Sequence, residues 1–319
     1  MKFLKSKAVK FLTIIIIIVI LSFLTIDKKI YNDFISTKIS NLINKSKIPI
    51  LVDSPKLFFK GIKSDNVSIN IPFFNILLLT RLSNCVVKPK LLSFLSDNYK
   101  IFFNANAYEG NIHGEINYTP SSNSEYSIEI KDVNTSLHPQ LASVNIKGGV
   151  LNIKASNIKN NLKRNIPING YVNFNLQSLT IPLTSGIIKS MIPLDLKEDL
   201  KNASISLNAQ FSESKIVIES LNFDSNLLKL NGSGELSLFE LNSDRLRGML
   251  FNVNIAMSEK FTKTISPSLI IPALTAARHR VNGKLSDNTK SFSAKISGSL
   301  NSLFIDIKDT SSNIRGVNN

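Results

Sequence analysis

From about residue 57 onwards, apolar and polar residues alternate along many short stretches of the chain. In 204–211 (SISLNAQF), Ile205, Leu207, Ala209 and Phe211 alternate with polar neighbours. Successive side chains of a strand point to opposite faces of a sheet, so this period of two predicts strands with one face on an apolar interior and the other in water. The same alternation is found in 126–133, 143–155, 171–176, 228–238, 251–256, 292–300 and 303–307.

Glycines recur inside several of these stretches. In 228–238 (LKLNGSGELSL), Gly232 and Gly234 fall in phase with the leucines on one side of the predicted strand. Glycine within a strand indicates bends or bulges, which a strongly curved sheet requires. Turn residues separate the stretches, as in 109–111 (EGN), 119–124 (TPSSNS) and 286–288 (SDN).

Only three segments beyond residue 57 have a helical pattern. They are 89–100, the short apolar stretch 184–193, and 258–280, in which we expect breaks at Pro267 and Pro272. These segments are too short to cover one face of a sheet with many strands, so the apolar face must be hidden by curling or doubling over. The prediction is a mainly β fold with a curved, largely antiparallel sheet, either a two-layer sandwich or a taco-like sheet around an apolar groove.

The N-terminal region carries a long apolar run. Residues 11–26 contain no charge, and a helix starting at Ala8 covers about 28 Å, enough to span a membrane. The run ends in LSFLTIDKK, with bulky residues where a signal peptidase needs small ones. We therefore expect an uncleaved transmembrane signal anchor at 8–26.

The predicted organisation follows from this anchor. The short tail is basic, with Lys2, Lys5 and Lys7, which favours a cytoplasmic N-terminus, an inner-membrane location and a body in the periplasm of a Gram-negative cell. Apolar residues at three- and four-residue steps, such as Ile35 and Ile39, predict an amphipathic helix after the anchor. The expected segments are a tail at 1–7, the anchor at 8–26, a helix or linker at 27–48, a β-rich periplasmic domain at 49–308 and a flexible tail at 309–319.

Composition excludes a disulfide framework, because the 319 residues include one cysteine. The formal charge of +15 raises the question of nucleic acid. However, the lysines are scattered, no aromatic and arginine stacking platform is present, and abundant Lys, Asn and Ile together are typical of an A+T-rich genome. We therefore expect no nucleic-acid partner, and consider attraction to anionic lipid or a merely solvated basic surface.

No constellation of catalytic residues is found. His113, His138 and His279 lack metal-binding spacing, and each is expected at the surface or on a strand edge. Cys85 is expected as a buried thiol in a strand, while Glu198 and Asp199 are expected as solvated charges at a helix end. The sequence thus predicts a protein that is not an enzyme, with no catalytic, cofactor-binding or metal-binding residues and no cofactor.

The order of these features carries a family resemblance. A basic tail, one membrane span and an amphipathic helix precede phrases such as PKLLSFLSDNYKIFFNANAYEGNIHGEI (89–116) and LNFDSNLLKLNGSGELSL (221–238). In these phrases the chain resembles the type II secretion system protein N (GspN) family, which is related to AsmA-like periplasmic proteins. The resemblance implies a single-pass inner-membrane component with a β-rich periplasmic domain and no known catalytic residues.

Two functions remain open. The first is a non-enzymatic component of a type II secretion system, whose sheet surface or edge contacts other secretion components. The second is an AsmA-like lipid-binding or lipid-transfer protein, in which the curled sheet shelters phospholipid acyl chains in an apolar groove. An open apolar trough favours lipid, whereas a closed core favours assembly.

Overall fold

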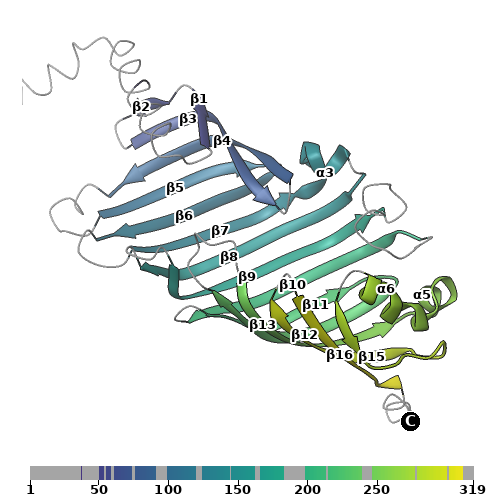
Figure 1. Ribbon diagram of the computed structural model, residues 1–319. Helices are drawn as coiled ribbons and strands as arrows, with labels where there is room; N and C mark the ends of the chain where they lie inside the picture. Colours follow the sequence, from purple (N-terminus) through teal and green to yellow (C-terminus); the bar gives the residue numbers. More distant parts are fainter. Residues whose placement is uncertain are drawn as a thin grey trace, which may run out of the picture. The chain divides into compact units, whose positions relative to one another are not determined.

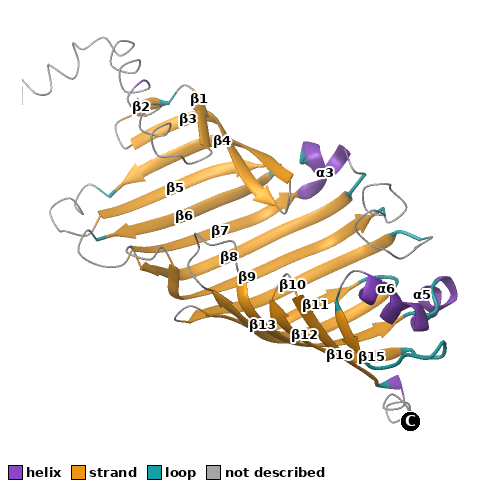
Figure 2. Cartoon of the chain, in the orientation of Figure 1, coloured by secondary structure: helices purple, strands orange, loops and turns teal. Residues whose placement is uncertain are grey.

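The computed structural model describes residues 37, 50–53, 55–58, 61–73, 76–90, 99–119, 124–143, 145–161, 166–182, 198–212, 215–238, 246–276, 279–299 and 302–311. These residues are mainly β with a few short helices, as predicted (Figure 2). They divide into two compact units, Met1–Val86 and Val87–Asn319.

The N-terminal predictions fall largely outside the described residues. Those residues include none of the anchor at 8–26 and only Thr37 of the predicted helix at 27–48. Across the residues that are described, no helix is both long enough and apolar enough to cross a membrane. The expected boundaries at residues 7, 26 and 48 therefore stay predictions.

The first unit is built from β1 (Ile50–Asp53), β2 (Lys56–Phe58), β3 (Gly61–Phe73) and most of β4 (Ile76–Pro89). Both β1 and β2 pair antiparallel with β3. The buried Ser64 hydroxyl bonds to the backbone carbonyls of Asp53 and Asn66, which ties β1 to β3.

The second unit contains an antiparallel meander, visible in Figure 1. Its strands are β5 (Tyr99–Ala107), β6 (Gly110–Tyr118), β7 (Ser124–Asn134), β8 (Lys147–Asn161), β9 (Ile166–Ile181), β10 (Leu200–Ser212), β11 (Lys215–Asp224), β12 (Leu228–Leu238), β13 (Leu246–Met257), β14 (Arg280–Asn282), β15 (Ser291–Ser299) and β16 (Ser302–Asp309). From β5 to β13 each strand pairs antiparallel with the next. β13 then pairs with β15, β15 pairs with β16, and β14 lies parallel to β16. Because these strands share one hydrogen-bonded sheet, the two-sheet sandwich is wrong for this unit.

Short helices occupy two connections. They are η2 (Thr135–Leu137) and α3 (Pro139–Ser143) between β7 and β8, and α5 (Glu259–Thr264), η3 (Pro267–Leu269) and α6 (Ile270–Ala276) between β13 and β14. The Ser258 hydroxyl caps α5 by accepting the Phe261 N–H. Within the predicted segment 258–280, residues 259–264 and 267–276 are therefore helical, whereas Arg280 begins β14.

Three details of the helix predictions are wrong. Pro272 does not break the helix, because it lies in the first turn of α6, where a backbone N–H has no intrahelical acceptor. The ends of the predicted helix at 89–100 are strand instead, in β4 and β5, and its middle lies outside the described residues. Likewise, Leu200 and Lys201 begin β10 rather than ending a helix.

The strand predictions are confirmed, except that Ser143 ends α3 and the strand predicted at 143–155 begins only at Lys147. Glycines account for only part of the sheet's irregularity. Gly148, Gly149 and Gly170 have positive φ angles of 68°, 96° and 138°. Other register shifts coincide with residues such as Asp132 and Asn157, whose φ angles are 54° and 53°. Short polar side chains tolerate this left-handed conformation and can bond to nearby backbone groups, so the bulges do not all need glycine.

The main hydrophobic cluster lies at the C-terminal end of the second unit. It consists of Leu227, Val253, Met257, Phe261, Ile265, Leu285, Phe292, Ala294, Ile305 and Ile307, with partly buried partners that include Leu200 on β10. The cluster joins Phe261 of α5 to side chains of β13, β15 and β16, and Ile270, Ile271 and Leu274 of α6 pack against it. The helical segment after β13 therefore covers this end of the sheet. Figure 1 shows β13, β15 and β16 turned relative to β8 and β9.

Candidate functional site

One face of the second unit is apolar along two complete rows of cross-strand neighbours. The first row, from β5 to β13, is Phe103, Gly114, Ile128, Ala155, Val172, Ala209, Ile218, Gly234 and Phe251. The second row is Ala105, Ile112, Ile130, Ile153, Phe174, Leu207, Leu221, Gly232 and Val253. No residue in either row has a polar side chain.

The exposure of these rows changes along the sheet. Most of the larger side chains from β6 to β11, such as Ile130, Ile153 and Phe174, are only half-buried. On β13, β15 and β16 the second row and its continuation are buried, with Val253 at 6% and Ile307 at 3% exposure, whereas Phe251 and Ile296 in line with the first row stay half-buried. We call the half-buried face from β6 to β11 the apolar trough and the buried cluster the closed end.

Bulky residues fill the space above the glycines in these rows. A Cβ atom on Gly114 would meet the Phe103 ring, with Cε1 at 2.5 Å. A Cβ on Gly234 would lie 2.8 Å from Phe251 Cγ, and one on Gly232 would lie 2.7 Å from Val253 Cγ1. The large side chain of each pair therefore lies over its glycine and fills the space that a side chain would need. This explains why these positions are glycine.

The opposite face of the same strands is polar. One cross-strand row runs through Asn104, His113, Glu129, Lys154, Asn173, Asn208 and Ser220. The Asn173 amide donates to Asn208 Oδ1 at 2.5 Å, and the Asn208 amide donates to Ser220 Oγ at 2.9 Å. The meander is thus amphipathic from β5 to β11, although Phe102 and Tyr171 also lie exposed on the polar face.

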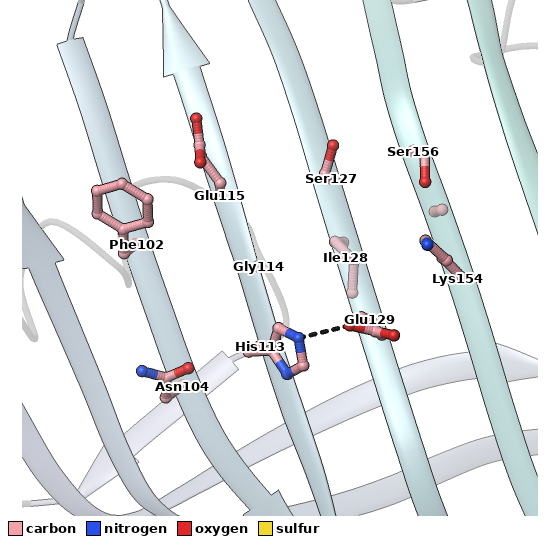
Figure 3. Close-up of a pocket in the computed structure, with 11 residues that line it drawn as sticks. Phe102, Asn104, His113, Gly114, Glu115, Ser127, Ile128, Glu129, Lys154 and Ser156 are labelled. Carbon is pink, nitrogen blue, oxygen red and sulfur yellow. Dashed lines mark hydrogen bonds and ion pairs between the residues drawn. The ribbon is translucent and has the colours of Figure 1, made fainter.

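A hollow of about 400 Å³ lies on the polar face over β5–β8 (Figure 3). In it, His113 Nε2 lies 2.7 Å from Glu129 Oε2, and Lys131 Nζ lies 3.1 Å from the other oxygen of Glu129. Lys100 donates to Glu115 at 2.8 Å. The Lys131 ammonium, followed by His113, lowers the pKa of Glu129, and the hydrogen bond from Lys100 lowers that of Glu115.

These contacts make the hollow a network of cross-strand ion pairs rather than a reactive centre. Both carboxylates already have cationic partners, and they lie on a face open to water, where such pairs contribute modestly to stability. Nowhere in the described parts of the chain do three His, Cys, Asp or Glu side chains come together as a possible metal site. The contact with Glu129 orients the His113 ring, but these residues do not indicate a particular reaction.

His138 is placed differently from the prediction. We expected a surface or strand-edge histidine, but it follows η2 and is 7% exposed, with its ring 5.3 Å from that of Tyr108 in the β5–β6 turn. Neither ring nitrogen has a hydrogen-bond partner, and burial lowers the pKa of the imidazole. The prediction fails because the contact joins residues thirty positions apart, which no local pattern encodes.

The remaining candidate residues lie apart from one another. Cys85 is on β4, as the strand context predicted, but its thiol is half-buried rather than buried, and partial burial raises its pKa. His279 is half-buried after α6. Glu198 is exposed and Asp199 half-buried just before β10, and the helix expected before them lies largely outside the described residues.

Comparison of the chain with protein-family models, with curated proteins and with solved structures finds no match. The site is therefore judged from its own geometry. Sequence analysis recognised both faces of the sheet and named Leu207 and Ala209, which lie on the trough, but not trough residues such as Ile153 and Phe174. The alternation of apolar and polar residues indicated which face of a strand each residue occupies. It does not show which residues lie side by side on the sheet until the register of neighbouring strands is known.

Proposed function

We propose that this chain is a membrane-tethered protein that holds lipid acyl chains on its apolar trough. The observation that carries the proposal is the pair of apolar rows, in which most of the larger side chains from β6 to β11 are only half-buried, with Ile218 as an exception. A solvent-facing surface of this kind is a marker of binding, since exposed apolar patches are unfavourable without an occupant.

Hydrocarbon matches this surface in chemistry and in length. An occupant that lies across both rows finds no hydrogen-bonding side chain there, so it gains only from apolar contact. Each CH₂ group removed from water contributes about 0.8 kcal/mol, so a chain of about 16 carbons gains roughly 13 kcal/mol before the cost of association. The five strand spacings from β6 to β11 cover about 24 Å, whereas one leaflet of a bilayer core is about 15 Å thick. An acyl chain that spans one leaflet therefore fits across the trough.

The test compares neighbouring residues that point to opposite faces. Ile153 lies on the apolar trough and Lys154 on the polar face, next to each other on β8. Full-length wild-type protein, purified in mild detergent, should carry phospholipid that mass spectrometry detects. Ile153→Asn should lose most of it, whereas Lys154→Asn should retain it. Wild-type protein free of lipid would sink the proposal.

A second proposal is that the chain is a non-enzymatic component of a type II secretion system. It rests on the resemblance to the GspN family. The two stretches that carry this resemblance, 89–116 and 221–238, contain the β5–β6 and β11–β12 hairpins. Pairing through the C-terminal sheet edge is disfavoured, because the short β14 covers part of β16. Deletion of the gene should then trap exported enzymes in the periplasm while envelope lipids stay normal; normal secretion would exclude this role.

A further inference from the structure

The two apolar rows of the trough continue directly into the closed end. Phe251 of the first row pairs with Ile296, which pairs with Ile305. Val253 of the second row pairs with Ala294, which in turn pairs with Ile307. The chemistry of the face therefore does not change at β13; along the second row its exposure does, since Val253, Ala294 and Ile307 are buried.

The cover over the closed end consists of the helical segment and the coil that come after β13. Phe261 of α5 is 4% exposed, Ile265 after it is 5% exposed, and Leu285 in the coil before β15 is 9% exposed. These side chains belong to the same cluster as Ile305 and Ile307. They occupy the place on β13–β16 that stays open on β6–β11.

Polar contacts hold this cover down. The buried Thr289 hydroxyl donates to Asp309 Oδ2 at 2.6 Å, and the Ser266 hydroxyl bonds to Asp287. A Cβ on Gly283 would clash with the Ile307 carbonyl oxygen, so only glycine allows the chain to pass this close to β16. The closed end is thus fixed by hydrogen bonds and close packing as well as by apolar burial.

We infer that the apolar trough has a blind end, meaning that it is closed at its C-terminal end by the cover over β13–β16. On this inference, which rests on the proposed function, an acyl chain lies across β6–β11 and stops where α5, η3 and α6 begin. The protein then holds a lipid and exchanges it through the open part of the trough, and lipid does not pass along the whole sheet to β16.

Charge indicates which lipids the trough holds. Lys147 and Lys159 near the two ends of β8, and Lys201 near the start of β10, are exposed. Within the described structure their ammonium groups make no ion pair. They flank the trough at the ends of its strands, and the chain carries a formal charge of +15. A phospholipid whose acyl chain lies across these strands can turn its headgroup toward the strand ends where these lysines lie, so the occupant we infer is an anionic phospholipid.

The experiment maps where an acyl chain touches the protein. The full chain is mixed with phosphatidylglycerol vesicles in which some lipid carries a diazirine at the end of one acyl chain, and is then irradiated and digested for mass spectrometry. We expect several-fold more label on trough residues such as Ile130, Ile153 and Phe174 than on Val253 or Ile305. The native protein is used, so no variant has to fold.

The possible outcomes separate the inference from the proposed function. Equal labelling of trough and closed end would show that lipid passes the cluster, which overturns the blind end but keeps lipid binding. No labelling of either region would overturn the proposed function itself. Equal labelling from vesicles of phosphatidylcholine would overturn the preference for anionic lipid.

Discussion

Ile153 and Ile305 lie on the same apolar face of one sheet, yet Ile153 is half-buried whereas Ile305 is 5% exposed. Both come from strands with the same alternation of apolar and polar residues. The two regions differ in their connections: β8 leads into β9, while β13 leads into α5, η3 and α6, which fold back over the sheet. Alternation therefore makes a face apolar, but a separate segment decides whether that face is core or binding surface.

The largest effect should come from removing the cover of the closed end. Phe261→Ala deletes a buried aromatic ring and should lower the free energy of unfolding by about 3–5 kcal/mol. Phe174→Ala, on the half-buried trough, should cost less, roughly 1–2 kcal/mol, because its ring already contacts water. Urea unfolding of lipid-free full-length protein measures both, and equal losses would contradict the division into trough and closed end.

A smaller effect should distinguish two glycines that are both at ordinary φ. Gly234, on β12, pairs with Phe251 on β13 in the first apolar row. A Cβ at Gly234 would strike the Leu250 carbonyl oxygen and the Phe251 ring. Gly234→Ala should therefore cost about 1–3 kcal/mol, as over-packing does. Gly248→Ala is the matched control on β13, since its Cβ would meet nothing within 4 Å. Similar unfolding midpoints for both variants would show that the surface at Gly234 is not tightly fitted.

The sequence predicted strands far better than it predicted surfaces. The segment 228–238 forms β12 with the predicted bounds, because a strand's two-residue period is local. Which residue lies beside Gly234 depends on register, set by bulges such as the shift between Ile218 and Leu221. The turn at Tyr108 and Glu109 has two positive φ angles without glycine. Residue types therefore predicted where the turn lies but not its backbone conformation.

The closed end was beyond sequence analysis for a related reason. The helical segment at 258–280 was recognised, but its pattern does not say which strands it covers. Its contacts join Phe261 to Ile305 and Ile307, more than forty residues further along the chain. Likewise, the burial of His138 depends on Tyr108. Contacts of this range come from tertiary packing, which overrides local preference.

The smallest effect concerns η2 and α3, the helical turns between β7 and β8. His138 is buried there without a hydrogen-bond partner, so protonation would place an uncompensated charge beside Tyr108. Burial lowers the pKa of His138 below its ordinary value of 6.5, which means that the unfolded chain takes up the proton first. Its contribution to stability is therefore complete above pH 6.5 and is lost as the pH falls below 6.5 through the lowered pKa.

His138→Leu should flatten this dependence, because leucine keeps the apolar contact and cannot be protonated. Glu115 and Glu129 do not confuse the measurement, since their lowered pKa values place their titration below 4.5. Unfolding midpoints in urea between pH 5 and 7.5 decide the matter, and a slope that survives in His138→Leu would assign the titration to another group.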